Sequence, residues 1–355
     1  MTFENYLSEK KAYVWRFIDQ RLREYQAADV ETLRLMQQEQ YVALLDEHWN
    51  ICRDYPERQG KYLRPALVLL MAEAMGVGSS QAVATAAAMQ MSEDWILIHD
   101  DLEDGSLQRR GKPALHRLVG AEIAINAGDT LHEAMHRILS ENYKLLDVGM
   151  AHCVSQEFFR MLSRTTFGQY AEIKWTLENK PDMTERDVLF TISGKTVYYT
   201  IAGPLRLGAI VAGATDEQLA QIYRFSYPLG VCFQIRDDVL DLTSDFEGQK
   251  KQKLNDIYEG KRTLILLHLL RHATPDERAR IEEILSKPRE QKQEQEVDYI
   301  RQLMDVYGSI DYAEEEARRY AEEAMEQLQH IDFITTEDYR QLFRQMVEFI
   351  LNRAR

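Results

Sequence analysis

The chain has 355 residues, 45% of them hydrophobic and 28% charged, so it can bury a large core and does not have a disordered composition. Its formal net charge of −15 disfavours general electrostatic binding to nucleic acid or to an anionic membrane surface. Its three cysteines, Cys52, Cys153 and Cys232, are too widely spaced to suggest a disulfide framework or a zinc site. With an acidic N-terminal segment and no run of 18 apolar residues, we expect a cytoplasmic protein without an export signal or membrane span.

Helical periodicity is the main structural signal. Glycine and proline are sparse, with 17 and 8 residues, and no long segment alternates apolar and polar residues. Apolar residues recur with helical spacing most clearly over 80–104, 121–139, 217–242 and 312–329. These patterns predict an all-α protein, built as a single large helical bundle with one domain over residues 1–355.

Turn residues mark where the predicted helices should stop. Breaks are expected at Asp54–Pro56, Gly105–Ser106, Lys180–Asp182 and Ala273–Pro275. The most hydrophilic stretch, 286–298, is expected to be a surface loop or a solvated helix with no special role. No repeat of solenoid period is present, so these breaks are interpreted as turns and not as domain linkers.

Two acidic segments stand at the ends of apolar helical runs. Their aspartates occupy positions i, i+1 and i+4: Asp100, Asp101 and Asp104 in the first segment, and Asp237, Asp238 and Asp241 in the second. Side chains at i and i+4 share one helix face, so each segment can present two carboxylates to one point. Like charges about 4 Å apart repel by roughly 1 kcal/mol in water and more in a protein, so a cation is needed. Oxygen-only ligands favour magnesium, which also binds substrate phosphates.

The alternative is that these are solvated helix ends without function. One such segment in an acidic chain would leave that alternative open. Two segments of the same pattern, both following strongly apolar runs, favour a pair of metal-binding helix ends with apolar residues lining a cavity beside them.

Basic residues near the first acidic segment are candidates for binding phosphate groups. Lys61 and Arg64 would share a helix face if their segment is helical, and Arg109 and Arg110 follow the first acidic segment. Each group by itself could equally form surface ion pairs. The sequence Ser193–Thr196 reads SGKT but is not a phosphate-binding P-loop, because the preceding strand and glycine-rich run are missing.

With these motifs in place, the chain resembles the polyprenyl synthetase family of trans-isoprenyl diphosphate synthases. The resemblance extends from about Gly60 to Lys261 and rests on LIHDDLEDGSLQRRGKPALH and on FQIRDDVLD followed by DIYEGKRT. It implies an all-α isoprenoid synthase fold with a central active-site cavity, a homodimer, and magnesium, with three ions expected. It also implies that an allylic diphosphate and isopentenyl diphosphate are the substrates.

The resemblance assigns roles to individual positions. Asp100 and Asp104 would bind two magnesium ions and Asp237 and Asp241 a third, with Asp101 and Asp238 in support. Arg109, Lys195, Lys251 and Lys261 would contact the allylic diphosphate, whereas Lys61, Arg64 and Arg110 would bind the diphosphate of isopentenyl diphosphate. Gln169, Thr196 and Gln234 correspond to polar positions of the active site. Asp100, Asp101, Asp104, Asp237, Asp238, Lys195 and Gln234 form the expected catalytic set.

Three departures from the family pattern limit these assignments. Glu93 stands where many members carry histidine or glutamine for isopentenyl diphosphate, and a carboxylate there requires protonation or a basic partner such as Arg58 or Arg64. Lys250 and Leu254 stand where glycines are usual. In addition, Glu172 replaces the usual aspartate.

Product length is set in the family by bulk on the helix before the first acidic segment. Trp95 and Ile96 are the fifth and fourth residues before Asp100. This pattern resembles short-chain enzymes that make products of fifteen or twenty carbons, with geranylgeranyl diphosphate slightly favoured. The alternative is that Trp95 is ordinary core packing.

Other functions stay open at the level of sequence. One is a non-catalytic subunit of a prenyltransferase pair, for which Glu93 and Leu254 are the motive. Another is a terpene cyclase or head-to-head condensing enzyme, which would not need Lys61, Arg64 and Arg110. A metal phosphohydrolase of the HD type, suggested by His99 next to Asp100, is the weakest because its further histidine ligands are not evident.

Overall fold

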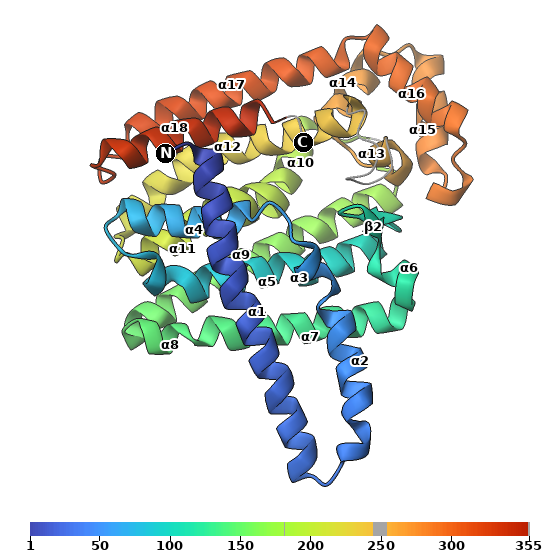
Figure 1. Ribbon diagram of the computed structural model, residues 1–355. Helices are drawn as coiled ribbons and strands as arrows, with labels where there is room; N and C mark the ends of the chain where they lie inside the picture. Colours follow the sequence, from blue (N-terminus) through green and yellow to red (C-terminus); the bar gives the residue numbers. More distant parts are fainter. Residues whose placement is uncertain (181, 244–253, 354–355) are drawn as a thin grey trace. The chain divides into compact units, whose positions relative to one another are not determined.

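The computed structural model describes residues 1–180, 182–243 and 254–353 (Figure 1). Helices make up nearly all of this part of the chain, which confirms the all-α prediction. The strands within these ranges are β1 (Gln108–Arg109) and β2 (Lys112–Pro113), which pair antiparallel. No described helix is both long enough and apolar enough to cross a membrane.

The described residues divide into two compact units. The first unit comprises Met1–Gln156 and Leu207–Ala214, and the second comprises the remaining described residues. The single domain expected from the sequence therefore stays a prediction.

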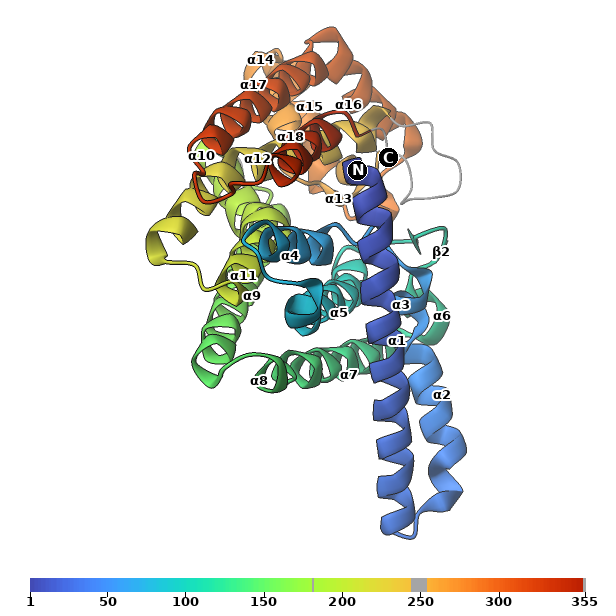
Figure 2. The ribbon, with the colours of Figure 1, turned by 60° about the vertical axis from the view of Figure 1, so that its left-hand side comes forward.

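The first unit consists of an N-terminal set of helices and the helix that ends in the first acidic segment. Its elements are α1 (Phe3–Leu35), η1 (Glu39–Tyr41), α2 (Val42–Cys52), α3 (Asp54–Arg58), α4 (Leu63–Ala74), α5 (Ser79–Glu103), the β1–β2 hairpin, α6 (Leu115–Val119), α7 (Ala121–Ser140), α8 (Asn142–Leu145), the start of α9 (Val148–Leu177) and the end of α11 (Gly203–Val211). Figures 1 and 2 show α2 returning alongside α1 after a short turn.

The core of this unit forms around α4 and α5. Nearly every residue of α4 is buried, and α5 buries a run of alanines that allows α4 and α7 to approach it closely. Gly208 allows α11 to approach α4 in the same way, because a Cβ atom at Gly208 would lie 2.2 Å from the carbonyl oxygen of Val68 in α4. The helix that leads to the first acidic segment is therefore held on several sides.

The second unit is organised around α12, which contains the second acidic segment. Its elements are the larger part of α9, α10 (Glu185–Thr191), the π-helix η2 (Ile192–Ala202), the start of α11, α12 (Asp216–Thr243), α13 (Asn255–Glu259), α14 (Leu264–His272), α15 (Pro275–Ser286), η3 (Arg289–Gln291), α16 (Glu294–Val306), α17 (Ser309–Gln329) and α18 (Glu337–Leu351). Helix α12 packs against both η2 and α17. At Gly230 a Cβ atom would lie 2.7 Å from the Cα atom of Val197, so the small residue lets α12 contact η2.

The sequence predicted the long helices well and two short segments poorly. Helices α5, α7, α12 and α17 cover the four periodic segments, and Thr274 caps α15 at the expected break, where Glu277 completes a capping box. The expected break at Asp54–Pro56 is wrong, because these residues belong to α3. The stretch 286–298 was expected to be a surface loop or a solvated helix. It does contain η3 and the start of α16, but it also contains a buried lysine, Lys292.

Candidate functional site

The first acidic segment occupies the C-terminal end of α5. Asp100 lies in the last turn, and Asp104 is the C-cap residue with helical backbone angles of −81° and −8°. The predicted i, i+4 pair is therefore placed on a helix end, and both of its side chains are partly exposed. The residue between them in the pattern, Asp101, is fully buried.

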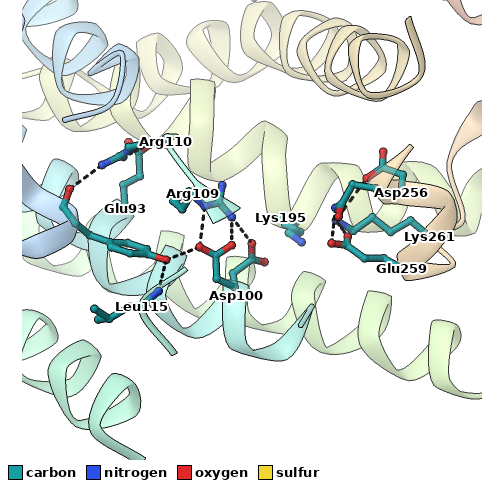
Figure 3. A network of polar contacts seen from close by, with 12 residues as sticks. Glu93, Asp100, Arg109, Arg110, Leu115, Lys195, Asp256, Glu259 and Lys261 are labelled. Carbon is teal, nitrogen blue, oxygen red and sulfur yellow. Dashed lines mark hydrogen bonds and ion pairs between the residues drawn. The ribbon is translucent and has the colours of Figure 1, made fainter. Parts of the chain in front are cut away.

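Asp101 is the centre of a buried network that ties α5 to the β1–β2 hairpin (Figure 3). The Tyr55 hydroxyl donates to Asp101 Oδ2 at 2.6 Å and accepts from the Leu115 backbone N–H at 3.1 Å. The Arg109 guanidinium donates to both carboxylate oxygens of Asp101, through Nε at 2.8 Å and through Nη2. Arg109 Nη2 also lies 3.7 Å from Asp100 Oδ2. Asp101 therefore fixes Arg109 beside the exposed carboxylate of Asp100.

The hairpin turn places Arg110 on the other side of the same network. Arg110 and Gly111 form its two-residue loop, and both have positive φ values, of 52° and 76°. The Arg110 Nη1 group donates to Asp94 Oδ1 at 3.0 Å and to the Tyr55 carbonyl oxygen at 2.9 Å. Gly60 lies against this guanidinium, since a Cβ atom there would be 2.7 Å from Arg110 Nη2. The glycine of the GKYLRP segment is thus explained by the arginine that packs on it.

Glu93 contacts two of the arginines that the sequence assigned to phosphate binding. Its carboxylate lies 3.2 Å from Arg64 Nη1 and 3.6 Å from Arg110 Nη2. Arg64 is thus its basic partner, as expected, whereas Arg58 pairs instead with Asp54 at 2.6 Å. The carboxylate at this unusual position is therefore compensated by the cations around it.

The neighbouring Asp94 carries a second acidic group into the interior. Burial raises the pKa of Asp94 to about 6, although the Arg110 guanidinium acts in the opposite direction. Since its side chain is buried and accepts from Arg110 Nη1, Asp94 anchors this arginine, while Glu93 lies near the Nη2 group of the same guanidinium.

Lys61 does not lie where its spacing from Arg64 predicted. Helix α4 begins at Leu63, and Tyr62 before it has left-handed backbone angles of 60° and 31°. The expected shared helix face of Lys61 and Arg64 is therefore wrong, because only Arg64 belongs to the helix. The Lys61 side chain is exposed.

Trp95 and Ile96 both lie on α5 and are partly buried. The Trp95 ring packs against His132 of α7, with centroids 4.7 Å apart, and against His99, with centroids 5.6 Å apart. Packing alone does not distinguish a wall for a substrate chain from ordinary core, so the role of Trp95 stays a prediction.

The second acidic segment lies in the last two turns of α12. Asp237 and Asp241 are partly exposed and Asp238 is buried, which repeats the pattern of the first segment. Arg353 Nη2 donates to Asp237 Oδ1 at 3.0 Å, and the Asp256 backbone N–H donates to Asp241 Oδ2 at 3.0 Å. The carboxylates that would hold a metal are thus already oriented by donors.

Asp238 ends a chain of hydrogen bonds that begins on η2. The Thr196 hydroxyl donates to Gln234 Oε1 at 2.5 Å, and the Gln234 amide donates to Asp238 Oδ1 at 2.7 Å. Burial, together with the nearby charge of Asp237, raises the pKa of Asp238 to about 8. Thr196 and Gln234 are therefore brought together with the acidic segment, as the sequence assignment requires.

The π-helical turn η2 carries Lys195 and accounts for the SGKT sequence. A Cβ atom on Gly168 of α9 would lie 2.7 Å from the Lys195 backbone nitrogen, and one on Gly194 would lie 3.2 Å from the Gly168 Cα atom. The two glycines thus allow α9 and η2 to touch. Lys195 Nζ lies 2.9 Å from Glu172 Oε2, and Gln169 lies on the same helix as Glu172.

The segment after the second acidic motif forms a tight turn around Lys261. Lys261 Nζ lies 2.6 Å from Glu259 Oε2 and 3.7 Å from Asp256 Oδ1 (Figure 3). Burial, with Asp241 nearby, raises the pKa of Asp256 well above its usual range. Leu254, at a position where the family usually has glycine, adopts φ of 58°. Lys250 and Lys251 lie outside the described residues.

Magnesium fits the donors that each unit presents. Within the described ranges, no three His, Cys, Asp or Glu side chains are grouped closely enough to hold a metal ion by themselves. Each acidic segment instead offers a pair of aspartates one helical turn apart. Magnesium takes one or two carboxylates and completes its shell with water and phosphate oxygens, so a paired site of this kind suits it when a diphosphate is bound. The described residues provide no additional histidine ligands of the kind an HD-type phosphohydrolase needs.

The sequence missed several residues that contact the candidate site, among them Asp94, Tyr55, Glu259 and Arg353. Asp94 could have been noticed, because it places a second acid next to Glu93 within an apolar helical run. Tyr55 and Arg353 gave no local signal, since their partners Asp101 and Asp237 lie 46 and 116 residues away in the chain.

Comparisons with known proteins agree with this architecture. The chain matches the family model described as polyprenyl synthetase over residues 47–304. It is 31% identical over 300 residues to the short chain isoprenyl diphosphate synthase of Methanothermobacter thermautotrophicus, which covers 83% of this chain and 86% of that protein. The crystal structure of geranylgeranyl pyrophosphate synthetase from Pyrococcus horikoshii is 27% identical, with a TM-score of 0.79 and 99% of each chain covered.

A further solved structure supports the fold alone. Geranylgeranyl pyrophosphate synthase from Corynebacterium glutamicum, complexed with isoprenyl diphosphate and magnesium, has a TM-score of 0.83 at 22% identity, with 96% of this chain and 99% of that chain covered.

The family match and the extent of the identity to the Methanothermobacter enzyme are decisive: the chain belongs to the polyprenyl synthetase family. The resemblance expected from the acidic motifs is thereby confirmed.

Replacing Tyr55 by phenylalanine tests the buried network of the first unit. Tyr55→Phe removes the donor to Asp101 and leaves the Leu115 N–H without its acceptor, so we expect the free energy of unfolding to fall by about 2 kcal/mol. Urea denaturation of the variant and of Tyr41→Phe, whose tyrosine is 51% exposed, gives the comparison. Equal stability of the two variants would contradict the role of Tyr55.

Proposed function

We propose that the chain is a magnesium-dependent trans-prenyltransferase, which condenses an allylic diphosphate with isopentenyl diphosphate and releases diphosphate. One observation carries the proposal. Two helices of a polyprenyl synthetase family member each end in a pair of aspartates one turn apart. Arg109, held by the buried Asp101, lies beside Asp100 of the first pair, and Arg353 donates to Asp237 of the second. The Methanothermobacter relative is a short chain isoprenyl diphosphate synthase, which is consistent with a product of fifteen to twenty carbons, geranylgeranyl diphosphate being slightly favoured.

The aspartate pairs are assigned to the metal ions. Asp100 and Asp104 would hold two magnesium ions, and Asp237 and Asp241 would hold a third. When bound, magnesium supplies positive charge to the oxygens of the departing diphosphate.

The cations are divided between the two substrates. Arg109, Lys195, Lys251 and Lys261 bind the diphosphate of the allylic substrate, and Lys61, Arg64 and Arg110 bind that of isopentenyl diphosphate. When these cations hold the allylic diphosphate, its carbon–oxygen bond breaks and the electron pair of that bond leaves with the diphosphate. The double bond of isopentenyl diphosphate attacks the allylic cation, and the released diphosphate accepts the proton that is lost. No side chain of the protein is required as the base.

The alternative functions are less well supported. A non-catalytic subunit was suggested by Glu93, but its carboxylate has basic partners in Arg64 and Arg110, and both acidic segments are complete. A terpene cyclase or a head-to-head condensing enzyme has no need for a second anion site, which Arg64 and Arg110 offer. The cytoplasmic location, the homodimer and the central cavity expected from the sequence stay predictions.

Loss of the first aspartate pair tests the reaction. Purified protein with magnesium should form a longer prenyl diphosphate from isopentenyl diphosphate and dimethylallyl, geranyl or farnesyl diphosphate. Asp100→Ala should lower kcat at least a hundredfold because it removes a metal ligand, and chelation by EDTA should abolish activity until magnesium is restored. Asp298→Ala, at an exposed position of α16, should match the wild type. Absence of product with every allylic primer would overturn the proposal.

Glu93→Gln tests the assignment of the arginines. Glutamine keeps the size of the side chain and removes a carboxylate that competes for Arg64 and Arg110, so the KM for isopentenyl diphosphate should fall about threefold to tenfold. The KM for the allylic substrate should stay the same, as should both constants in Glu133→Gln, an exposed control on α7. A higher KM for isopentenyl diphosphate would mean that Glu93 orients the arginines rather than competing with the substrate.

Trp95→Ala tests the control of product length. If the indole ring that packs on His132 blocks the growing chain, its removal should shift the products measured by mass spectrometry toward longer chains with each primer. A destabilised protein with an unchanged product distribution would show that Trp95 is core packing. Tryptophan removal at Trp175, which packs on Phe190 in the second unit, serves as the matched control.

A further inference from the structure

The hydrophilic stretch after α15 directs two of its cations toward the turn that carries Lys261. Arg289 begins the short helix η3, and Lys292 follows it with a side chain that is almost fully buried at 7% exposure. Lysine is among the residues least often buried, so a surface loop without a role does not account for this placement.

Lys292 caps the helix that precedes Lys261. Its Nζ group donates to the carbonyl oxygen of Tyr258 at 2.6 Å, in the last turn of α13. A Cβ atom on Gly260 would lie 3.4 Å from this ammonium group, so Lys292 also packs against the left-handed residue, φ of 76°, that directly precedes Lys261. A cation at the carbonyl end of a helix is electrostatically favourable, and here it fixes the point where the chain turns.

Arg289 holds the carboxylate that contacts Lys261. Its Nη2 group donates to Asn255 Oδ1 at 2.7 Å, and its Nη1 group lies 3.3 Å from Glu259 Oε1. The other oxygen of Glu259 lies 2.6 Å from Lys261 Nζ. The Glu259 side chain is only 5% exposed, so Arg289 and Lys261 share a carboxylate that is almost fully buried.

This arrangement is costly for the fold. Burial lowers the pKa of Lys292 to about 8, and the neighbouring cations Arg262 and Arg289 act in the same direction, opposed by Glu259 and Glu290. Folding therefore brings several cations together around the 255–261 turn. Costs of this kind are characteristic of functional sites.

We propose that Arg289 and Lys292 are positioning residues, which hold the 255–261 turn from behind so that Lys261 presents its ammonium group to the anionic substrate. The inference rests on the proposed function, in which Lys261 binds the allylic diphosphate. Lys292 fixes the backbone before Lys261, and Arg289 fixes the carboxylate that holds its side chain.

Kinetics of Lys292 variants test this role. Lys292→Met removes the ammonium group and keeps most of the side-chain volume, so the KM for the allylic diphosphate should rise about tenfold while the KM for isopentenyl diphosphate changes less than twofold. Lys292→Arg, which keeps a cation and a donor, should recover most of the loss. Lys287→Met is the matched control, because Lys287 lies in the same stretch and pairs with Glu296 of α16 instead of the turn. Loss of stability alone would not affect one substrate selectively.

A binding measurement separates this inference from the proposed function. With magnesium present, inorganic pyrophosphate should raise the Tm of the wild type and of Lys287→Met more than that of Lys292→Met. Unchanged kinetics in Lys292→Met, or an equal rise in both KM values, would overturn the positioning role while leaving the prenyltransferase intact. A wild type without product from any primer would overturn the proposed function, and the Tm shifts would then decide whether Lys292 positions an anion site. Equal shifts in all three proteins would overturn the positioning role.

Discussion

Crowding of carboxylates is the constraint on which the candidate site depends, and the two acidic segments meet it differently. Each segment places two aspartates at a helix surface and buries the one between them. The negative charge of Asp101 is compensated by the Arg109 guanidinium, which donates to both carboxylate oxygens, and by the Tyr55 hydroxyl, which donates to one of them. Asp238 has instead an amide donor, Gln234, and burial raises its pKa to about 8. The two segments share a sequence pattern but differ in how the charge of the central aspartate is compensated. A cation bound from solution would therefore stabilise the second segment more than the first.

The cations assigned to substrate show a common arrangement. Four of them have an acid of the same unit beside them, in the pairs Arg109–Asp101, Arg110–Asp94, Lys195–Glu172 and Lys261–Glu259. In a chain with a net charge of −15, such pairing keeps long basic side chains from folding onto arbitrary surface carboxylates. It also fixes their orientation before an anion arrives, which reduces the cost of ordering them upon binding. The acids behind the cations are thus part of the site, although none of them needs to touch a substrate.

Local sequence predicted the helices and the charged positions, but not the partners that orient them. The i, i+4 spacing of the aspartates was sufficient to place Asp100 with Asp104 and Asp237 with Asp241, because helix geometry is local. The prediction that Lys61 and Arg64 share a helix face was wrong, because Tyr62 has a left-handed conformation and α4 begins only after it, at Leu63. Contacts such as Tyr55 with Asp101 depend on packing between distant segments, which periodicity does not encode. The glycines of GKYLRP and SGKT became intelligible only from what lies against them, the Arg110 guanidinium and Gly168.

Leu254 shows how such distant contacts can replace a local preference. A glycine adopts a left-handed conformation at little cost, whereas for a leucine this conformation costs roughly 1 kcal/mol or more of folding free energy. The turn persists because the Leu254 N–H donates to the Asp241 carbonyl oxygen at 3.3 Å and the next turn is held by Arg289 and Lys292. External contacts thus determine the backbone that a glycine would merely permit. A turn held in this way has less conformational freedom than a glycine turn, and this favours a fixed position for Lys261 over a mobile one.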